Sequence, residues 1–325
     1  MGRTGQPWVI VLAAGEGKRL GSLTRGKGVR PVPKQFCAFC NEKSLLELTI
    51  ERASRLAPVE RIVPIVAEQH WPLWRIQLAR IPPENIVAQP VNRDTAPGIL
   101  LPLMRVLGRD PSARVVILAS DHYVEDEEVL GGALATVAGG DEGGEEDAVT
   151  LLGFTPDSPD TELGWIIPRR VAGRRVHPVA AFVEKPAPHW AQILMEHGAL
   201  WNSFLFAGAG QSILRLYEGV LPQLLGSFQF ALGTRGGEWL PWRVEALYDD
   251  LPSRNFSREI LQRAVRHLRV LPVPPCGWTD LGTPERVFEF LAHRETGGEP
   301  RLSGPALWRK HVEVPQALEE LSATS

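Results

Sequence analysis

A glycine-rich, basic loop follows the first apolar run of the chain. Residues 8–12 (Trp-Val-Ile-Val-Leu) are typical of a short buried strand, and the residues after it that can approach phosphate are Ala14, Gly15, Gly17 and Arg19. Glycines let a backbone come close to phosphate groups, and successive N–H groups in such a loop form an anion-binding concavity. Arg19 and Lys34 add positive charge to the same loop. Open α/β sheets bind nucleotides where a strand leads into such a loop, so the pattern predicts a nucleotide-handling enzyme.

Neither of the two commonest phosphate-binding motifs is present in this loop. A dinucleotide fingerprint requires a third glycine where Leu20 stands. A P-loop requires a serine or threonine after its lysine, but Gly28 follows Lys27. The pattern therefore disfavours a P-loop kinase or ATPase. Taken alone, the segment is also compatible with an ordinary surface loop.

Two isolated aspartates each follow a predicted strand. Asp121 comes after residues 114–119, the clearest central strand of the chain, and Asp280 follows the strand at 270–273. Open sheets bind ligands at the carboxyl ends of their strands, and two carboxylates suffice for a Mg²⁺ ion whose other ligands are water and phosphates. Asp121 and Asp280 are therefore candidate magnesium ligands. Each is also compatible with a turn or a helix cap when considered singly.

Gln89 ends a short predicted strand, and the segment after it enters a helix. The side-chain amide of Gln89 can donate to a base edge and accept from it at the same time. Gln89 is therefore a candidate for nucleotide recognition. The same segment is equally typical of a capped helix start, with Asp94 or Thr95 as the N-cap.

Polar residues near three further strand ends have the chemistry to bind a sugar phosphate. Glu184 can accept hydrogen bonds from hydroxyls, and the ammonium group of Lys185 can neutralise a phosphate. Gly164 precedes an aromatic residue and is suited to close packing over a ring, while the amide of Asn202 can bind hydroxyls. Considered separately, these are solvated strand ends. Their order along the chain is what points to a site.

Alternating strand-like and helix-like segments must position these side chains. Strands are predicted at residues 8–12, 61–66, 85–88, 114–119, 149–154, 164–168, 179–184, 201–206 and 270–273. Helices are predicted at residues 45–56, 96–107, 189–197, 283–294 and 312–323. The alternation predicts a doubly wound α/β fold, with a mixed, mostly parallel central sheet and helices on both faces.

The composition is that of an ordinary globular protein. The 325 residues are 44% hydrophobic and 22% charged, and their formal net charge of −3 argues against a nucleic-acid-binding protein. No apolar run reaches the ~20 residues that span a bilayer, and no convincing signal peptide is present, so we expect a cytoplasmic protein without a membrane partner. Cys37, Cys40 and Cys276 are predicted to be reduced packing residues, although Cys37 and Cys40 also give a weak hint of a zinc site.

Taken in order, these segments resemble the sugar-1-phosphate nucleotidylyltransferases, and most closely the mannose-1-phosphate guanylyltransferases. The resemblance is carried by Pro-Lys-Gln-Phe at 33–36, Asn-Arg-Asp-Thr-Ala-Pro at 92–97 and Phe-Val-Glu-Lys-Pro at 182–186. It implies a Rossmann-like GT-A nucleotidyltransferase fold. It also implies a catalytic domain over residues 1–283, followed by a short C-terminal helical extension over 284–325.

The resemblance implies a role for each matching residue. It implies catalytic roles for Arg19, Lys34 and Asp121. It implies nucleotide contacts for Ala14, Gly15, Gly17, Gln89 and Arg93. It implies sugar-phosphate contacts for Gly164, Glu184, Lys185 and Asn202, and Mg²⁺ binding by Asp121 and Asp280.

The implied reaction transfers a nucleotidyl group from GTP to mannose 1-phosphate and gives GDP-mannose and pyrophosphate. Ala14 and Phe204 stand where the family often has glycine, and Ser257 falls near a position where relatives often have aspartate, so the sugar and the base stay open. The alternatives are the same chemistry with glucose 1-phosphate and UTP or dTTP, the same chemistry with a heptose phosphate, and a silent regulatory subunit that binds a nucleotide sugar. The sequence argues against a fused isomerase or acyltransferase module after residue 283. It leaves the oligomeric state open, a homodimer included.

Overall fold

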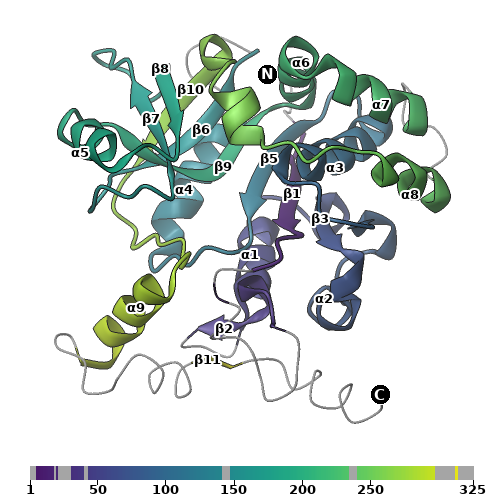
Figure 1. Ribbon diagram of the computed structural model, residues 1–325, viewed down its shortest axis with the longest axis horizontal. Coiled ribbons are helices and arrows are strands. Elements are labelled where there is room, and N and C mark those ends of the chain that lie inside the picture. The colour runs from purple at the N-terminus through teal and green to yellow at the C-terminus, as the bar shows by residue number, and fades with distance from the viewer. Residues whose placement is uncertain are drawn as a thin grey trace.

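The fold is built on a mixed β-sheet. The computed structural model describes residues 5–17, 20, 31–39, 43–140, 147–233, 240–296 and 312–313. Within these residues, nine strands form one sheet in the order β4-β3-β1-β5-β9-β6-β10-β8-β7 (Figure 1). The strands are β1 (Trp8–Ala13), β3 (Ile62–Ala67), β4 (Val87–Gln89), β5 (Arg114–Ala119), β6 (Val149–Phe154), β7 (Gly164–Pro168), β8 (His177–Glu184), β9 (Leu200–Ala209) and β10 (Leu268–Val273).

Strand β1 lies inside the parallel part of the sheet. It pairs in parallel with β3 on one side and with β5 on the other, and β3 pairs in parallel with β4. Successive side chains of a strand point to opposite faces. Val9 and Val11 accordingly join one hydrophobic core, and Ile10 joins the other. A strand buried on both faces needs a continuous apolar run, and β1 has one.

Strand β9 links the two halves of the sheet. It runs antiparallel to β5 on one side and to β6 on the other, and its first residues also pair with β7. The sheet is mixed, as predicted, but parallel pairing is confined to β4-β3-β1-β5 and β6-β10 and does not prevail throughout. The sequence does not reveal this difference, because a mostly buried antiparallel strand such as β9 has the same apolar run as a parallel one.

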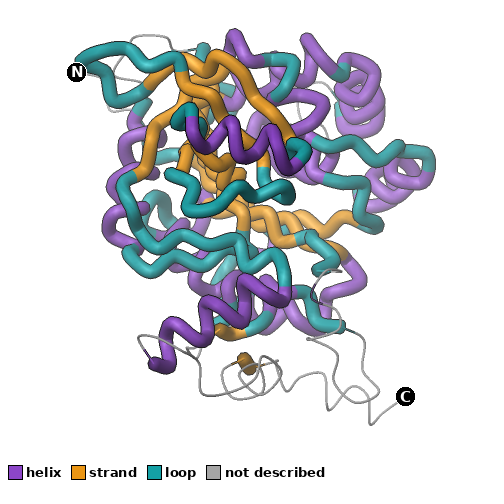
Figure 2. Tube along the Cα trace, turned by 60° about the vertical axis from the view of Figure 1, so that its left-hand side comes forward, coloured by secondary structure: helices purple, strands orange, loops and turns teal. Residues whose placement is uncertain are grey.

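Helices cover both faces of the sheet, and Figure 2 shows the strands running through the middle of the molecule with helices outside them. The core that contains Val9 is completed by α1 (Leu45–Ser54), α4 (Glu127–Gly139) and α9 (Pro284–Thr296), with contributions from α2 (Trp71–Gln77) and α5 (Pro188–Glu196). The core that contains Ile10 is completed by α3 (Thr95–Arg109), α6 (Gly210–Val220), α7 (Pro222–Leu232) and α8 (Pro241–Asp249). No helix in the described part of the chain combines the length and the apolar character needed to cross a membrane.

The C-terminal segment differs from its prediction. A helix is predicted at 312–323, but Val312–Glu313 form strand β11, which pairs antiparallel with β2 (Ala38–Phe39). Backbone pairing with a distant strand overrides the local helical pattern at these two residues. Residues 314–325 lie outside the described residues, and the domain division at residue 283 stays a prediction.

Candidate active site

A cleft of about 750 Å³ opens at the carboxyl ends of β1, β4 and β5 and reaches the adjoining ends of β7, β8 and β9. The residues predicted from the sequence that line it are Ala14, Gly15, Gly17, Lys34, Gln89, Asp121, Gly164, Glu184, Asn202 and Asp280. Arg19 and Cys40 lie outside the described residues. The fold thus brings the predicted nucleotide and sugar-phosphate residues into one cavity.

The loop after β1 is held in shape by the segment that follows it. Gln35 donates from its side-chain amide to the carbonyl oxygens of Ala13 at 3.1 Å and Gly15 at 2.7 Å. Gly17 has a φ of 62°, and a Cβ at this position would lie 2.7 Å from Cα of Pro33. Only glycine fits this close approach with a positive φ. These contacts fix the loop backbone at the cleft wall.

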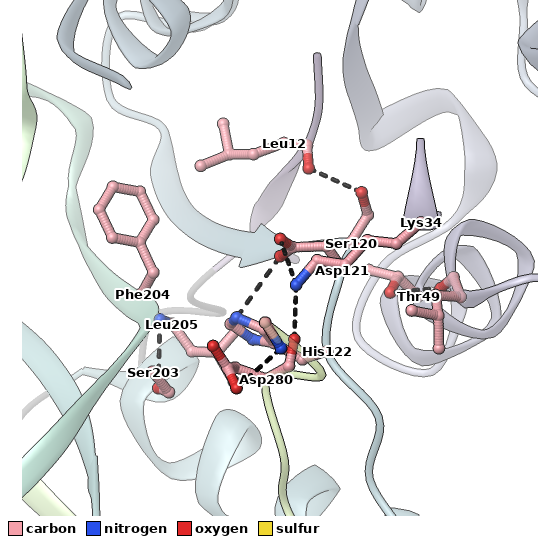
Figure 3. A network of polar contacts seen from close by, with 12 residues as sticks. Leu12, Lys34, Thr49, Ser120, Asp121, His122, Ser203, Phe204, Leu205 and Asp280 are labelled. Carbon is pink, nitrogen blue, oxygen red and sulfur yellow. Dashed lines mark hydrogen bonds and ion pairs between the residues drawn. The ribbon is translucent and has the colours of Figure 1, made fainter. Parts of the chain in front are cut away.

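Lys34 lies at the centre of the polar contacts in the cleft (Figure 3). The residue is 6% exposed, and its Nζ donates to the carbonyl oxygen of Asp280 at 2.5 Å. The same Nζ forms an ion pair with Oδ2 of Asp121 at 3.1 Å. Ser120 donates its hydroxyl to the carbonyl oxygen of Leu12 at 2.7 Å, which fastens the end of β5 to β1. Three distant parts of the chain therefore meet at one ammonium group.

His122 places a buried imidazole next to Asp121. Its Nε2 lies 3.4 Å from Oδ1 of Asp121, and its ring packs edge-on against Trp278 with the centroids 5.1 Å apart. Burial lowers the pKa of His122 and outweighs the opposing effect of Asp121, so the ring is neutral at neutral pH. Among the described residues, its buried Nδ1 has no hydrogen-bond partner. The ring therefore packs beside Asp121 without adding positive charge.

The carboxylate of Asp280 is held by two donors. Its Oδ1 accepts from the backbone N–H of Gly282 at 3.1 Å and from Nη1 of Arg286 at 2.5 Å. A side chain at residue 282 would collide with Oδ2 of Asp280. The described residues contain no group of three or more histidine, cysteine or acidic side chains that could hold a metal ion by themselves. Asp121 and Asp280 on one cleft instead fit a cation whose remaining ligands are phosphates and water.

Gln89 reaches the cleft from the end of β4, and α3 begins close by. Its Oε1 accepts a long hydrogen bond of 3.5 Å from the hydroxyl of Tyr248. Asp94 is the N-cap of α3, with a φ of 69° and a carboxylate that accepts from the N–H of Thr95 at 2.6 Å. Asn255 also donates to this carboxylate, at 3.2 Å. The interpretation of this segment as a capped helix start is confirmed, and Asp94 is the cap.

The opposite wall comes from β7, β8 and β9, where three of the predicted residues are neighbours in the sheet. Gly164 pairs with Glu184 on β8 and with Asn202 on β9. A Cβ on residue 164 would lie 2.7 Å from Oε2 of Glu184, so the glycine leaves room for that carboxylate. Burial raises the pKa of Glu184 to about 7, against the opposing effect of Lys185 and Arg258. This wall therefore places hydrogen-bonding groups beside a glycine.

Comparison with known proteins assigns the chain to a family. Residues 8–296 match the family described as nucleotidyl transferase. The chain belongs to the nucleotidyl transferase family. The match begins at β1 and ends with α9, so it includes every described residue that lines the cleft.

Curated relatives of this nucleotidyl transferase are named mannose-1-phosphate guanylyltransferase. The chain is 30% identical to the protein of that name from Escherichia coli K12 over 300 residues, which are 89% of this chain and 60% of that protein. It is 29% identical to the protein from Salmonella muenchen over 289 residues, which are 86% of this chain and 59% of that protein. The chain spans about three fifths of the length of these relatives.

A solved structure supports the same relationship. A crystal structure described as mannose-1-phosphate geranyltransferase from Thermus thermophilus is 31% identical and has a TM-score of 0.74. The match covers 87% of this chain and 79% of that one. The predicted α/β nucleotidyltransferase fold is therefore confirmed.

Two predicted residues of this nucleotidyl transferase do not line the cleft. The guanidinium of Arg93 donates to the carbonyl oxygens of Tyr248 at 2.8 Å and Asp249 at 3.0 Å, at the end of α8. A guanidinium satisfies the unpaired carbonyls at a helix end, so Arg93 has a structural contact here, and its nucleotide contact stays a prediction. Lys185 lies beside the cleft and forms an ion pair of 3.1 Å with Glu162, which does line it.

Other residues of the nucleotidyl transferase cleft were missed by the sequence reasoning. Gln35 had a signal, because it lies within the segment 33–36 that carries the family resemblance. Arg286 had none, because one of its partners, Asp160, lies 126 residues earlier in the chain. His122 directly follows Asp121, and nothing in the sequence indicates that its ring is buried.

Proposed function

We propose that the protein transfers a guanylyl group from GTP to mannose 1-phosphate, with Mg²⁺ as cofactor, and releases GDP-mannose and pyrophosphate. The observation that carries this proposal is the Lys34 ammonium, which contacts both Asp121 and Asp280 where the glycine-rich loop faces the sugar-side wall. The similarity to proteins named mannose-1-phosphate guanylyltransferase supports the choice of sugar and base.

Charge neutralisation and positioning account for the chemistry of such a cleft. A sugar-phosphate oxygen is already an anion, so its attack on the α-phosphorus of GTP requires no general base. Catalysis then rests on alignment of the two substrates and on electrostatic stabilisation of the phosphates. Lys34 would exchange its contact with Asp121 for a contact with the α-phosphate. Arg19, which lies outside the described residues, is assigned to the triphosphate.

Asp121 and Asp280 are the residues that would hold Mg²⁺. The Asp121 side chain is 41% exposed, and Oδ2 of Asp280 accepts no hydrogen bond from any described residue, whereas Oδ1 accepts two. Both carboxylates therefore retain capacity for a cation. The ion, when bound, supplies positive charge to the triphosphate and to the leaving pyrophosphate.

The two walls of the cleft divide the recognition of the substrates. Gln89 and the loop at residues 14–17 are assigned to guanine and the triphosphate. Gly164, Glu184 and Asn202 are assigned to the hydroxyls of mannose. Lys185, next to Glu184 and paired with Glu162, is assigned to the sugar phosphate.

Pyrophosphate release tests the proposal directly. The full chain is assayed with Mg²⁺ across a grid of four nucleoside triphosphates and several sugar 1-phosphates. We expect the dominant signal for GTP with mannose 1-phosphate. A dominant signal for another pair would discard the substrate assignment and keep the reaction class. Silence across the grid, together with calorimetric binding of GDP-mannose, would identify a regulatory protein and contradict the proposal.

A further inference from the structure

Arg286 is a mostly buried arginine to which the proposed reaction assigns no role. It projects from the first turn of α9, and its side chain is 19% exposed. Its Nη1 donates to Oδ1 of Asp280 at 2.5 Å, and its Nη2 forms an ion pair with Oδ2 of Asp160 in the loop between β6 and β7. Its guanidinium also lies 5.4 Å from the ring centroid of Trp201. One side chain therefore joins three separate segments behind the cleft.

The carboxylate of Asp160 determines how Arg286 affects the charge of Asp280. An arginine paired with Asp280 alone would cancel its charge and compete with a cation for it. Because Asp160 is included, two carboxylates face one guanidinium, and the group of three carries a net charge of −1. Arg286 also binds the same oxygen, Oδ1, that the N–H of Gly282 binds, and leaves Oδ2 available. Asp280 is thus oriented without losing the negative charge that a divalent cation requires.

The same guanidinium is linked to the strands of the sugar-side wall. Trp201 precedes Asn202 on β9, and Trp165 follows Gly164 on β7. Trp165 donates its indole N–H to the carbonyl oxygen of Asp160 at 2.8 Å. The two tryptophans pair across β7 and β9, with their rings edge to face and the centroids 6.2 Å apart. The guanidinium therefore supports the proposed metal carboxylate and the sugar-side strands at once.

We propose that Arg286 is a positioning residue that orients the Asp280 carboxylate for the divalent cation and holds it in register with the sugar-side wall. The inference rests on the proposed function, since it takes Asp280 as a metal ligand. It makes α9 part of the site, whereas the sequence prediction placed this helix in a separate extension. Residues that orient a metal ligand typically contribute about 10–100-fold to metal affinity.

Direct binding of Mn²⁺ tests the proposal without turnover. Free Mn²⁺ is measured by electron paramagnetic resonance as it is titrated into the full chain in the presence of a fixed concentration of GDP-mannose, with the same concentration of GDP-mannose alone as the blank. We expect Arg286→Gln to raise the dissociation constant about 10–100-fold. Arg286→Lys keeps the charge but loses the fork that reaches both carboxylates, so it should raise the constant by less. Unchanged or tighter binding by Arg286→Gln would overturn the proposal, because the arginine would then be idle or a competitor of the cation.

Two comparison variants separate this inference from the proposed function. Asp280→Asn removes the proposed ligand, so Mn²⁺ binding equal to that of the wild type would refute the metal site itself. Loss of binding in Asp280→Asn but not in Arg286→Gln would refute only the role of Arg286. Arg109→Lys is the matched control, because Arg109 also makes a hydrogen bond, to Asn85 at 2.6 Å, and lies 4.7 Å from the Trp8 ring centroid without lining the cleft. We expect it to bind Mn²⁺ like the wild type.

A double variant keeps the test decisive if Arg286→Gln does not fold. Removal of Arg286 leaves two largely buried carboxylates without their cation, whereas Arg286→Gln/Asp160→Asn leaves only one. We expect the double variant to fold and to bind Mn²⁺ weakly.

Steady-state kinetics give a second readout. For the Arg286 variants, kcat should fall and the Mg²⁺ concentration for half-maximal rate should rise, while KM for GTP changes little. Lower activity with an unchanged Mg²⁺ requirement would indicate a merely structural role and overturn the proposal.

Discussion

At the scale of single residues, the cleft depends on a few partly desolvated charges. The ammonium of Lys34 is buried and paired with Asp121, so water would screen its proposed contact with a phosphate only weakly. For Glu184, by contrast, burial in the wall formed by β7, β8 and β9 disfavours the ionised carboxylate and raises its pKa. These two positions provide the most direct tests of the chemistry.

Loss of either charge beside the proposed α-phosphate site should nearly abolish turnover. We expect Lys34→Ala and Asp121→Ala each to lower kcat about 10²–10³-fold, as removal of one preorganised electrostatic contact commonly does. Circular dichroism should report an intact fold. Lys43→Ala is the control, since Lys43 forms an exposed ion pair with Glu51 and should leave the rate unchanged. Near-normal activity of either cleft variant would contradict the assignment.

The raised pKa of Glu184 should appear in the pH dependence of stability. The folded protein releases this proton near pH 7, whereas the unfolded chain releases it near the ordinary value of 4.5. The folded state therefore binds more protons between these values, and its free energy of unfolding falls as the pH rises through that window. Glu184→Gln removes the titrating group. Urea denaturation of both proteins from pH 4.5 to 7.5 should show the wild type losing stability relative to the variant, and parallel curves would refute the shift.

Whether the sequence predicts a site residue depends on how far away its partners are. Gln89 ends β4 and Asp121 lies two residues past the end of β5, so the topology of the sheet alone brings them to the cleft. The contact of Arg93 with α8 could not be predicted, because the carbonyls that it contacts lie 155 and 156 residues farther along the chain. Arg286 was missed for the same reason. A local sequence pattern identifies the kind of group that a side chain can bind. It does not identify which residue, distant in the sequence, the side chain contacts in the folded protein.

At the scale of elements, the ends of strands and helices are set by local signals, whereas strand direction is not. Strands β5, β6 and β7 have the predicted bounds, because a buried strand leaves a continuous apolar run in the sequence. Helices α2, α4, α6, α7 and α8 were not predicted, and the antiparallel direction of β9 could not be read from the sequence. Both depend on how the chain returns across the sheet.

The cap of α3 offers a test at this scale. Asp94 caps the helix and adopts a φ of 69°, a conformation that costs most residues energy. We expect Asp94→Ala to lower the free energy of unfolding by about 2 kcal/mol, because it loses the cap and strains the backbone. Asp94→Gly loses the cap without the strain and should lose less, and Asp94→Asn should stay near the wild type. Equal losses for alanine and glycine in urea denaturation would contradict the strained cap.

At the scale of the whole molecule, β9 makes one sheet of two groups of strands. It is hydrogen-bonded to β5 of the nucleotide-side half and to β6 of the sugar-side half. The two walls of the cleft therefore share one continuous backbone network. Strands in such a network should open together rather than as independent units.

Native-state hydrogen exchange tests this cooperativity. We expect the amides of β1 and β6 to exchange through openings of the same free energy, because both belong to the sheet that β9 completes. Mass spectrometry with increasing denaturant should give exchange isotherms for the two strands that merge. Separate isotherms would show that the two sides of the cleft unfold as separate units.

Lys34 and Asp280, whose carbonyl oxygen Lys34 contacts, are 246 residues apart in the sequence. This separation determines which part of the cleft is synthesised first. Chains emerge from the ribosome N-terminus first, so the glycine-rich loop is exposed long before Asp280 and Arg286 have been translated. A nascent chain therefore has the proposed phosphate-binding loop but an incomplete cleft. Prematurely terminated chains that lack Asp280 and Arg286 should therefore have no activity. Such chains should not hydrolyse nucleotide in a side reaction.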